Sequence, residues 1–541
     1  MGSLPSSGKL GERLLPSVLD ELAAKDPDRV LYSMARTNNP AEGFVDITVR
    51  AFSRAVDRCA WYIEEKLGRG EGFPTLTYMG PQTCIYPMMV LGCIKTGYKL
   101  LLNSPRNTLE QHLYLFEKTD CNTFLVPPNF PLPVVKQILG ARQMRVVDVV
   151  ADINHWIAED GPAKPYPYNK TFDEAKGEPL VVLHTSGSTG MPKPIVMKHG
   201  TCAPMDAYIQ LPSLGYKPTI PAACAGERMY VAFPLFHSAG ISVTLPAAIY
   251  NGFTAVLGPW PPTADVANAV HLHGNVQMSC LAPMTLVDLS KNPQYVENLS
   301  RVHTVAFGGG PLPQAVGDVL SQKTHLCSVL GTTECGVLPN QTLDPEDWAY
   351  LSYSPIYGHE FRHFSGDLYE MVVVKNPKFE LYQGIFHTFP ELDEWNMKDL
   401  YAKHPTKDDA WLYKGRSDDI IVFSTGEKLN PLDMENIINA NPAVSSALIV
   451  GLGRFQSSLL VEAVEPPSTD AEKAELLDAI WPSIKAANKE SPSHGRILRD
   501  MTIFTSADKP MLKAGKGTVQ RQMTLDLYAD EIDQLYNALE N

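Results

Sequence analysis

A run of hydroxyl-bearing residues and glycines that ends in a lysine is the segment of this sequence best suited to chemistry. The apolar residues 180–183 precede it and are typical of a buried strand. Glycines let backbone N–H groups approach an anion, hydroxyls add donors and lysine adds a mobile charge, so the segment predicts a polyphosphate site. A flexible surface loop would have a similar composition, but the preceding strand and the Pro-Lys ending favour phosphate binding. The spacing of the glycines and the lysine differs from that of a Walker-type loop. The residues concerned are Thr185, Ser186, Gly187, Ser188, Thr189, Gly190 and Lys193.

Two further loops could complete such a site. Residues 331–334, Gly-Thr-Thr-Glu, place a hydroxyl beside a carboxylate after an apolar strand, which suits hydrated Mg²⁺ held against phosphate oxygens. Residues 308–310 are three glycines that leave room for a flat ring against the backbone, although a tight turn would need the same residues.

A histidine and a lysine stand where they could serve catalysis. His237 lies in the run Phe-Pro-Leu-Phe-His-Ser-Ala-Gly at 233–240. A lone histidine after apolar residues is usually a core residue, and these neighbours make a functional role equally plausible. Lys516 is flanked by glycines; it fits a basic surface loop, or a mobile lysine that neutralises charge on a carboxylate and a phosphate.

Length and composition bound the class of protein. A chain of 541 residues exceeds what one hydrophobic core usually supports, so at least two domains are expected. The net charge of −14 argues against nucleic acid as a partner, and no apolar run approaches the ~20 residues of a membrane span. Nine scattered cysteines without a Cys-x-x-Cys pair argue against disulfides and structural zinc and favour a cytoplasmic location.

Alternating strand and helix patterns predict layered α/β architecture. Residues 15–67 are expected to be helical, because apolar residues recur there every three or four positions. After residue 415 the pattern predicts a small separate α/β unit, so the expected domains are 1–415 and 416–541. Strands are expected at 75–79, 99–102, 305–307, 327–330, 446–451 and 457–464, and helices at 87–95, 471–489 and 524–539.

These motifs, in this order over nearly the whole chain, resemble the adenylate-forming superfamily of acyl-CoA synthetases, luciferases and the adenylation domains of nonribosomal peptide synthetases (NRPSs). The resemblance implies a large multi-subdomain adenylation domain for ATP, Mg²⁺ and a carboxylic acid, then a small mobile domain carrying the catalytic lysine. It implies a hinge at Asp418, the metal at Glu334 and Lys516 as that lysine. Lys513 stays open, because Arg521 lies further on than in the superfamily's Gly-Lys-x-x-Arg spacing. The implied catalytic residues are Lys516, His237, Thr333 and Glu334.

The resemblance also implies how the nucleotide is held. Asp399 would accept hydrogen bonds from both ribose hydroxyls, and Arg416 would add a donor. Leu330 replaces the aromatic residue that usually stacks on adenine, so apolar packing is expected, with Gly308 and Gly309 beside the ring. The residue before Asp399 is a lysine where most relatives have glycine, a variation similar to reductase-type adenylation domains.

The class of acid is predicted from the residues implied to line its pocket. Relatives that activate amino acids place an aspartate directly after the His237 position to pair with the α-ammonium, and this chain has Ser238. A buried ammonium without a carboxylate is costly, so α-amino acids should be rejected. An aryl or small non-amino acid is expected, first a substituted benzoate, while a quaternary-ammonium acid stays open. The implied pocket residues are His237, Ser238, Met284, Gly308, Val329 and Cys335.

Two stretches, 103–107 and 415–431, narrow the resemblance to fungal NRPS-like carboxylic acid reductases. In those enzymes a carrier domain with a phosphopantetheine thiol and an NAD(P)H reductase domain follow. This chain shows neither a Gly-Gly-x-Ser site nor a dinucleotide fingerprint, so an excised first domain is expected, with NADPH used only in the missing domain. The alternatives are a stand-alone acyl-CoA ligase, an NRPS-like synthetase with a thioesterase, and an inactive nucleotide-binding regulator.

Overall fold

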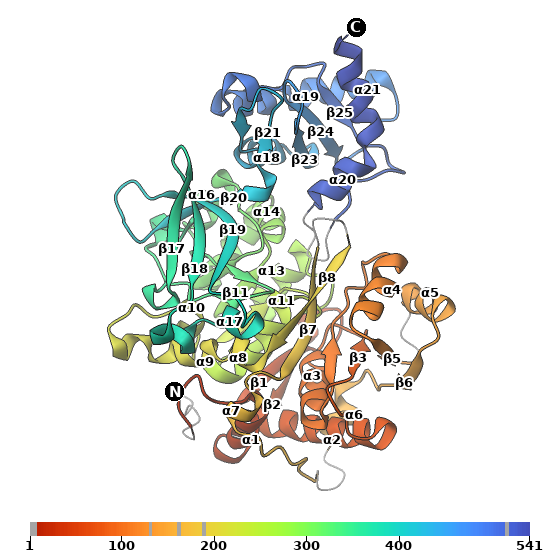
Figure 1. The fold of residues 1–541 in the computed structure, drawn as a ribbon, viewed down its shortest axis with the longest axis vertical. Helices are drawn as coiled ribbons and strands as arrows, with labels where there is room; N and C mark the ends of the chain where they lie inside the picture. Colours follow the sequence, from red (N-terminus) through yellow and green to blue (C-terminus); the bar gives the residue numbers. More distant parts are fainter. Residues whose placement is uncertain (1–7, 129–131, 159–163, 187–190, 514–518, 541) are drawn as a thin grey trace. The chain divides into compact units, whose positions relative to one another are not determined.

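Two compact units make up the chain (Figure 1). The first contains most residues up to His359 together with Val373–Trp395, and the second contains Glu360–Val372 and the chain from Asn396 onward. The computed structural model describes residues 8–128, 132–158, 164–186, 191–513 and 519–540. Its sheets and helices confirm the α/β class, whereas the boundary expected after residue 415 lies within the second unit and stays a prediction. All nine cysteines are buried, and none of them forms a disulfide. No helix of the described ranges is long and apolar enough to span a bilayer.

A six-stranded sheet in the first unit carries the predicted phosphate loop. It contains β3 (Thr75–Tyr78), β4 (Lys99–Leu101), β5 (Cys121–Val126), β6 (Arg145–Asp148), β7 (Pro179–Ser186) and β8 (Pro192–Lys198), with α2 (Val49–Leu67), α3 (Ile85–Thr96), α4 (Leu109–Lys118) and α5 (Pro133–Ala141) around it. The order is β6-β5-β3-β4-β7-β8, parallel except for the pair β7–β8. Leu100 packs with α2 and α3 on one face of the sheet, and Leu101 packs with α4 and α5 on the other. Because both faces are covered, the sequences of these strands are continuous apolar runs.

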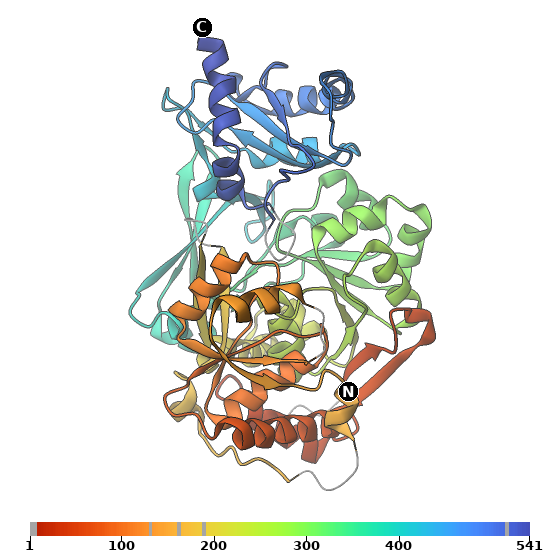
Figure 2. The same cartoon turned by 90° about the vertical axis from the view of Figure 1, so that its right-hand side faces the viewer.

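A seven-stranded sheet in the same unit carries the predicted acid pocket. It contains β1 (Val30–Ala35), β2 (Phe44–Thr48), β9 (Arg228–Val231), β10 (Thr254–Leu257), β11 (Met278–Leu281), β12 (Thr304–Phe307) and β13 (His325–Ser328). The order is β13-β12-β11-β9-β10-β1-β2, and only the pair β1–β2 is antiparallel. Helices α13 (Ala264–His273) and α14 (Pro283–Ser290) pack against it (Figure 2, green). Its parallel strands therefore end at one shared edge.

The expectation of helix throughout residues 15–67 is wrong in its middle. Helix α1 (Leu15–Lys25) and helix α2 form as predicted, but β1 and β2 lie between them. Strand β1 pairs in parallel with β10, with Tyr32 opposite Ala255, and Tyr32 is fully buried. Because the pairing partner lies far along the chain, local periodicity could not reveal the strand.

Two larger sheets lie mainly in the second unit, which also contains the short pair β21 (Ile421–Val422) and β22 (Lys428–Leu429). Strands β17 (His359–Ser365), β18 (Leu368–Val374), β19 (Glu394–Lys403) and β20 (Trp411–Arg416) are neighbours in one, and β23 (Val444–Val450), β24 (Ser458–Ala463) and β25 (Thr502–Phe504) form the other. Helices α18 (Leu432–Asn439) and α19 (Asp470–Glu490) cover one face of the second sheet, and α20 (Arg521–Leu527) and α21 (Ala529–Glu540) form part of a separate hydrophobic cluster with it. The single helix expected at 524–539 is thus two helices, separated at Tyr528.

Candidate active site

The predicted phosphate loop connects two antiparallel strands. Thr185 lies opposite Lys193 in the β7–β8 ladder (Figure 1, yellow), so the segment is a hairpin and differs from a loop that leads into a helix. Lys193 is exposed, and its Nζ lies 5.7 Å from the centroid of the Phe389 ring. Residues Gly187, Ser188, Thr189 and Gly190 lie outside the described residues.

His184, which the sequence reasoning missed, joins this hairpin to the loop at 103–107. Its Nε2 accepts the Ser104 N–H at 3.1 Å and lies 3.4 Å from Asn107 Nδ2. Burial lowers the pKa of His184 to about 4, so the ring is neutral near pH 7 and can accept these bonds. The only signal in the sequence is a polar residue at the end of an apolar strand, directly before Thr185.

A tight hairpin presents Thr333 and Glu334. It is made of β14 (Gly331–Thr332) and β15 (Gly336–Val337). The Thr332 hydroxyl accepts a backbone N–H three residues on at 3.1 Å, which closes the turn. Thr333 is buried and Glu334 is half-buried.

Two adjacent residues join the lysine and the glutamate of the predicted phosphate site. Thr388 Oγ1 donates to the backbone carbonyl of Glu334 at 2.8 Å, and the next residue, Phe389, lies beneath Lys193. Thr388 Oγ1 also lies 2.9 Å from Thr201 Oγ1. Since the single Thr388 proton goes to Glu334, Thr201 is the donor in that second bond. The fold therefore brings together two motifs that are distant in the sequence.

Most predicted pocket residues follow the carboxyl ends of neighbouring parallel strands, and these ends share one edge of the sheet. Met284 is 54% exposed, whereas Gly308 is buried and Val329 is half-buried. Cys335 is buried in the turn between β14 and β15. His237 and Ser238 follow β9, Met284 follows β11, Gly308 follows β12, and Val329 follows β13.

The glycines at 308 and 309 are required for two different reasons. A Cβ on Gly308 would lie 2.7 Å from the Val329 carbonyl oxygen, so the backbones of two strand ends meet there. Gly309 has φ +89°, in the left-handed region that favours glycine. The close approach at Gly308 is thus to the chain itself.

His237 caps a short helix. Its Nδ1 accepts the Ala239 N–H at 3.3 Å at the start of α11 (Ser238–Ser242), and its own N–H donates to the Pro234 carbonyl at 3.0 Å. A Cβ on Gly240 would lie 2.0 Å from that same carbonyl oxygen. The Pro and Gly of the motif therefore set the half-buried position of the histidine ring.

Leu330 is clamped by an asparagine that the sequence did not single out. The Asn340 side chain accepts the Leu330 N–H at 3.0 Å and donates to the Leu330 carbonyl at 2.7 Å. It also donates to the Leu338 carbonyl at 2.9 Å, and it is buried. The amide acts like a neighbouring strand for Leu330, and only the fold places it there.

In the second unit, the predicted ribose residues lie together. Asp399 and Arg416 are opposite each other in the β19–β20 ladder, with Nη1 3.5 Å from Oδ1. Arg416 also pairs with Asp418 at 3.1 Å, and Asp399 is buried. Burial alone would lower the pKa of Arg416, but Asp399 and Asp418 raise it above its ordinary value.

The lysine before Asp399 occupies a position suited to glycine. Lys398 has φ +62°, a conformation that is strained for most residues. Asn396 Oδ1 accepts a hydrogen bond from the Lys398 N–H at 2.7 Å. The Glu370 carboxylate accepts one from the Asn396 side-chain amide at 2.6 Å and another from the Ser417 hydroxyl at 2.7 Å. This network supports the turn that carries Asp399.

The two candidate lysines differ in what the structure describes. Lys513 Nζ forms a 2.6 Å ion pair with Glu462, whereas Lys516 lies outside the described residues. Arg521 donates to both oxygens of the buried Glu435, at 2.5 and 2.6 Å, and its Nε lies 3.5 Å from Asp419. Arg521 thus belongs to an internal ion-pair network of the second unit.

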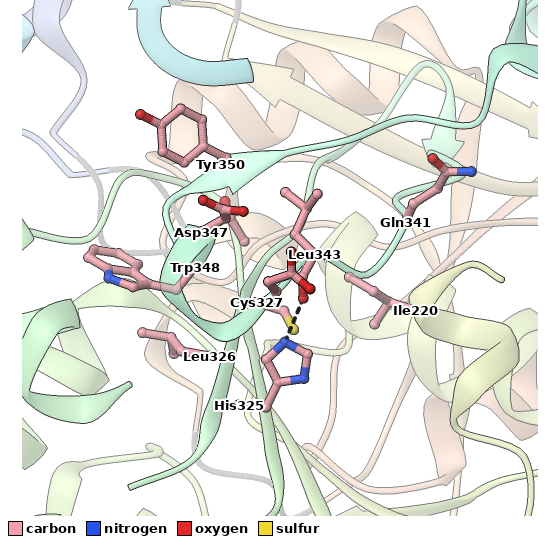
Figure 3. Close-up of a pocket in the computed structure, with 11 residues that line it drawn as sticks. Ile220, His325, Leu326, Cys327, Gln341, Leu343, Asp347, Trp348 and Tyr350 are labelled. Atoms are coloured by element: carbon pink, nitrogen blue, oxygen red, sulfur yellow. Dashed lines mark hydrogen bonds between the residues drawn. The ribbon is translucent and has the colours of Figure 1, made fainter. Parts of the chain in front are cut away.

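A pocket beside β13 contains none of the predicted site residues (Figure 3). It is lined by Ile220, residues 325–328, Gln341, Leu343, Asp344, Asp347, Trp348 and Tyr350. Inside it, His325 Nε2 lies 3.0 Å from the Leu343 carbonyl oxygen. We assign this pocket no role in catalysis.

Magnesium would need phosphate oxygens to complete its coordination. Within the described ranges, no three His, Cys, Asp or Glu side chains gather as a metal site. Mg²⁺ usually takes one or two protein carboxylates together with substrate phosphates, and Glu334 offers one carboxylate next to Thr333. These residues fit a metal that arrives with ATP.

Comparison with known families identifies the class of protein. The family model described as AMP-binding enzyme matches residues 19–362, and that of the AMP-binding enzyme C-terminal domain matches residues 418–540. The chain therefore belongs to the AMP-binding enzyme family and is an enzyme of the adenylate-forming type. The resemblance inferred from its motifs is confirmed.

Individual relatives refine this picture. The chain is similar to a carboxylic acid reductase of Neurospora crassa, with 36% identity over 98% of this chain and 51% of that protein. It is also similar to the isocyanide synthase–NRPS hybrid crmA of Aspergillus fumigatus, with 34% identity over 98% of this chain and 34% of that protein. This chain thus spans about half the length of the Neurospora protein and about a third of the length of the Aspergillus protein. Its fold resembles that of the anthranilate CoA ligase AuaEII in complex with anthranoyl-AMP, with a TM-score of 0.70, 15% identity and full coverage of both chains.

Proposed function

We propose that this chain activates a carboxylic acid with MgATP and then passes the acyl group to a thiol. In the first step a carboxylate oxygen bonds to the α-phosphorus of ATP while the bond to pyrophosphate breaks. In the second, the thiol attacks the acyl carbon and AMP leaves. Bound Mg²⁺ would neutralise phosphate charge, and the protein's main task is to position the reactants.

This proposal rests on the contacts that Glu334 and Lys193 make with two adjacent residues, 388 and 389. Lys193 and the hydroxyls of the β7–β8 hairpin would hold the phosphates. Thr333 would contact the α-phosphate, and Glu334 would bind the metal. A lysine, a buried hydroxyl and a carboxylate on neighbouring turns suit a nucleotide with its metal.

The second unit would complete the reaction. Asp399 and Arg416 would hold the ribose, and Lys516 would neutralise charge between the carboxylate and the phosphate. We place the domain boundary after residue 415, with rotation about Asp418; the C-terminal family match beginning at residue 418 supports this division. Such a rotation would let one site run both half-reactions in turn.

The acceptor thiol would be the phosphopantetheine of a carrier domain. An NAD(P)H-dependent domain would then reduce the acyl group. The reaction would take place in a reducing cytoplasm. The Neurospora relative, named as a carboxylic acid reductase and about twice as long, supports this context. The Aspergillus relative is an NRPS hybrid and favours an NRPS-like synthetase as the second candidate. The product that the natural full-length protein releases with NADPH distinguishes the two candidates. An aldehyde would favour the reductase, and a condensed product would favour the NRPS-like synthetase.

Aryl acids are expected to support ATP–pyrophosphate exchange, and proteinogenic α-amino acids are not. The buried Ser238 offers no carboxylate for an α-ammonium group, whose desolvation would cost several kcal/mol. Exchange should be measured with substituted benzoates, short apolar acids, a quaternary-ammonium acid and amino acids at equal concentrations. Exchange with α-amino acids alone would refute the predicted pocket and leave adenylation standing. No exchange with any acid would refute the proposed activity.

Lys193→Ala is expected to weaken MgATP binding by roughly tenfold to a hundredfold, because it removes a charge-assisted contact to phosphate. Calorimetric titration with MgATP measures the effect. Lys170→Ala is the matched control, since Lys170 Nζ also lies over a phenylalanine ring, 5.3 Å from the centroid of Phe73, and is outside the predicted site. Equal affinities for the wild type and Lys193→Ala would mean that the hairpin does not bind phosphate.

A further inference from the structure

We propose that Thr388 and Phe389 are positioning residues that place the lysine and the glutamate of the phosphate site. The inference rests on the proposed function. Neither residue belongs to a motif in the sequence, and neither is expected to touch the reacting atoms. Each instead contacts a different residue assigned to the nucleotide: Thr388 the backbone of Glu334, and Phe389 the ammonium of Lys193.

Thr388 holds the turn that carries the carboxylate. Its hydroxyl donates to the Glu334 carbonyl at 2.8 Å while accepting from Thr201 at 2.9 Å, and both threonines are buried. A hydroxyl that accepts one bond and donates another has a defined direction. The Glu334 carbonyl, and with it the direction in which the carboxylate leaves the turn, is therefore tied to a fixed donor.

Phe389 restricts the conformations of the lysine. Lys193 Nζ lies 5.7 Å from the Phe389 ring centroid, and that ring stacks on Trp395 at 5.0 Å with an interplanar angle of 9°. A cation over an aromatic face is attracted to it by the charge distribution of the ring. Because stacking limits movement of the ring, the exposed lysine is held beside the hairpin before a phosphate arrives.

Both contacts come from a rigidly packed segment. Helix α17 (Ile385–Thr388) is pressed against α8 (His199–Cys202) by two glycines. A Cβ on Gly384 would lie 2.3 Å from the Thr201 carbonyl oxygen, and one on Gly200 would lie 2.4 Å from the His387 ring. Side chains on so close a contact have little freedom, which is what a positioning role requires.

Four variants test the two roles by calorimetric binding of MgATP at a series of Mg²⁺ concentrations. Thr388→Val should raise the Mg²⁺ concentration needed for half-maximal binding about fivefold, and Thr388→Ser should restore it. Phe389→Leu should weaken MgATP binding at saturating Mg²⁺ by about two- to fivefold, and Phe389→Tyr should restore it.

Matched controls separate positioning from general loss of stability. Thr324→Val removes a buried hydroxyl bonded to the Val302 carbonyl, and Phe73→Leu removes the ring beneath Lys170, outside the segment that carries Thr388 and Phe389. Both controls should bind MgATP as the wild type does. Unchanged binding in Thr388→Val and Phe389→Leu, or equal losses in the controls, would overturn the inference.

The proposed activity is judged separately in the same preparations. Wild-type protein that binds MgATP but exchanges pyrophosphate with no acid would refute acid activation, and the four binding curves would still decide the positioning roles. Wild-type protein that binds no MgATP would overturn both.

Discussion

Alanine in place of Lys516 is expected to slow acyl-adenylate formation by about 10²- to 10³-fold, the usual effect of losing one group that stabilises charge in a transition state. Lys513→Ala is the matched comparison, because Lys513 is three residues away and its ammonium already pairs with Glu462 at 2.6 Å. It should retain adenylation. ATP–pyrophosphate exchange at saturating acid and MgATP measures both rates.

The second half-reaction provides the reciprocal test. Lys516→Ala should still transfer the acyl group from a pre-formed acyl-adenylate to a carrier thiol supplied separately. Asp418→Pro should do the reverse, because proline fixes φ at the expected pivot. If Lys513→Ala alone loses adenylation, Lys513 and not Lys516 is the catalytic lysine. Loss of the same half-reaction in Lys516→Ala and Asp418→Pro would refute the hinge.

Arg13→Met is expected to destabilise the first unit by about 3–5 kcal/mol, because it leaves a buried carboxylate without its partner. Arg13 Nε donates to Asp206 Oδ2 at 2.9 Å, and the Gly11 N–H donates to the same oxygen at 2.7 Å. The two charged side chains are 3% and 0% exposed. Asp206 lies in α9 (Pro204–Ala207), so this pair holds the N-terminal segment against α9.

Two further variants make that result specific. Arg13→Met/Asp206→Leu should recover most of the lost stability, since replacing both members of a buried pair is often nearly neutral. Lys9→Met breaks the neighbouring exposed pair with Glu12 and should leave the unfolding midpoint nearly unchanged. Urea unfolding followed by tryptophan fluorescence measures all three. A destabilisation in Arg13→Met no larger than that in Lys9→Met would show that the buried pair contributes little.

Local patterns in the sequence were sufficient for much of the fold. Continuous apolar runs predicted strands at 75–79 and 99–102, because strands buried on both faces have no polar alternation. Strands at 446–451 and 457–464 and the helix at 471–489 are confirmed as well. The pattern failed at residues 30–48, where the pairing of β1 with the distant β10 decides the conformation.

The candidate site divides in the same way. The order of its motifs was enough to identify the AMP-binding enzyme family, because glycines, hydroxyls and charged residues that contact a nucleotide lie on short loops with recognisable spacing. Only the tertiary structure revealed the residues that hold those loops. His184, Asn340 and Thr388 act through hydrogen bonds to backbone groups of other segments. Such bonds depend on which elements the fold brings together, and they leave no periodicity or spacing in the chain from which they could be predicted.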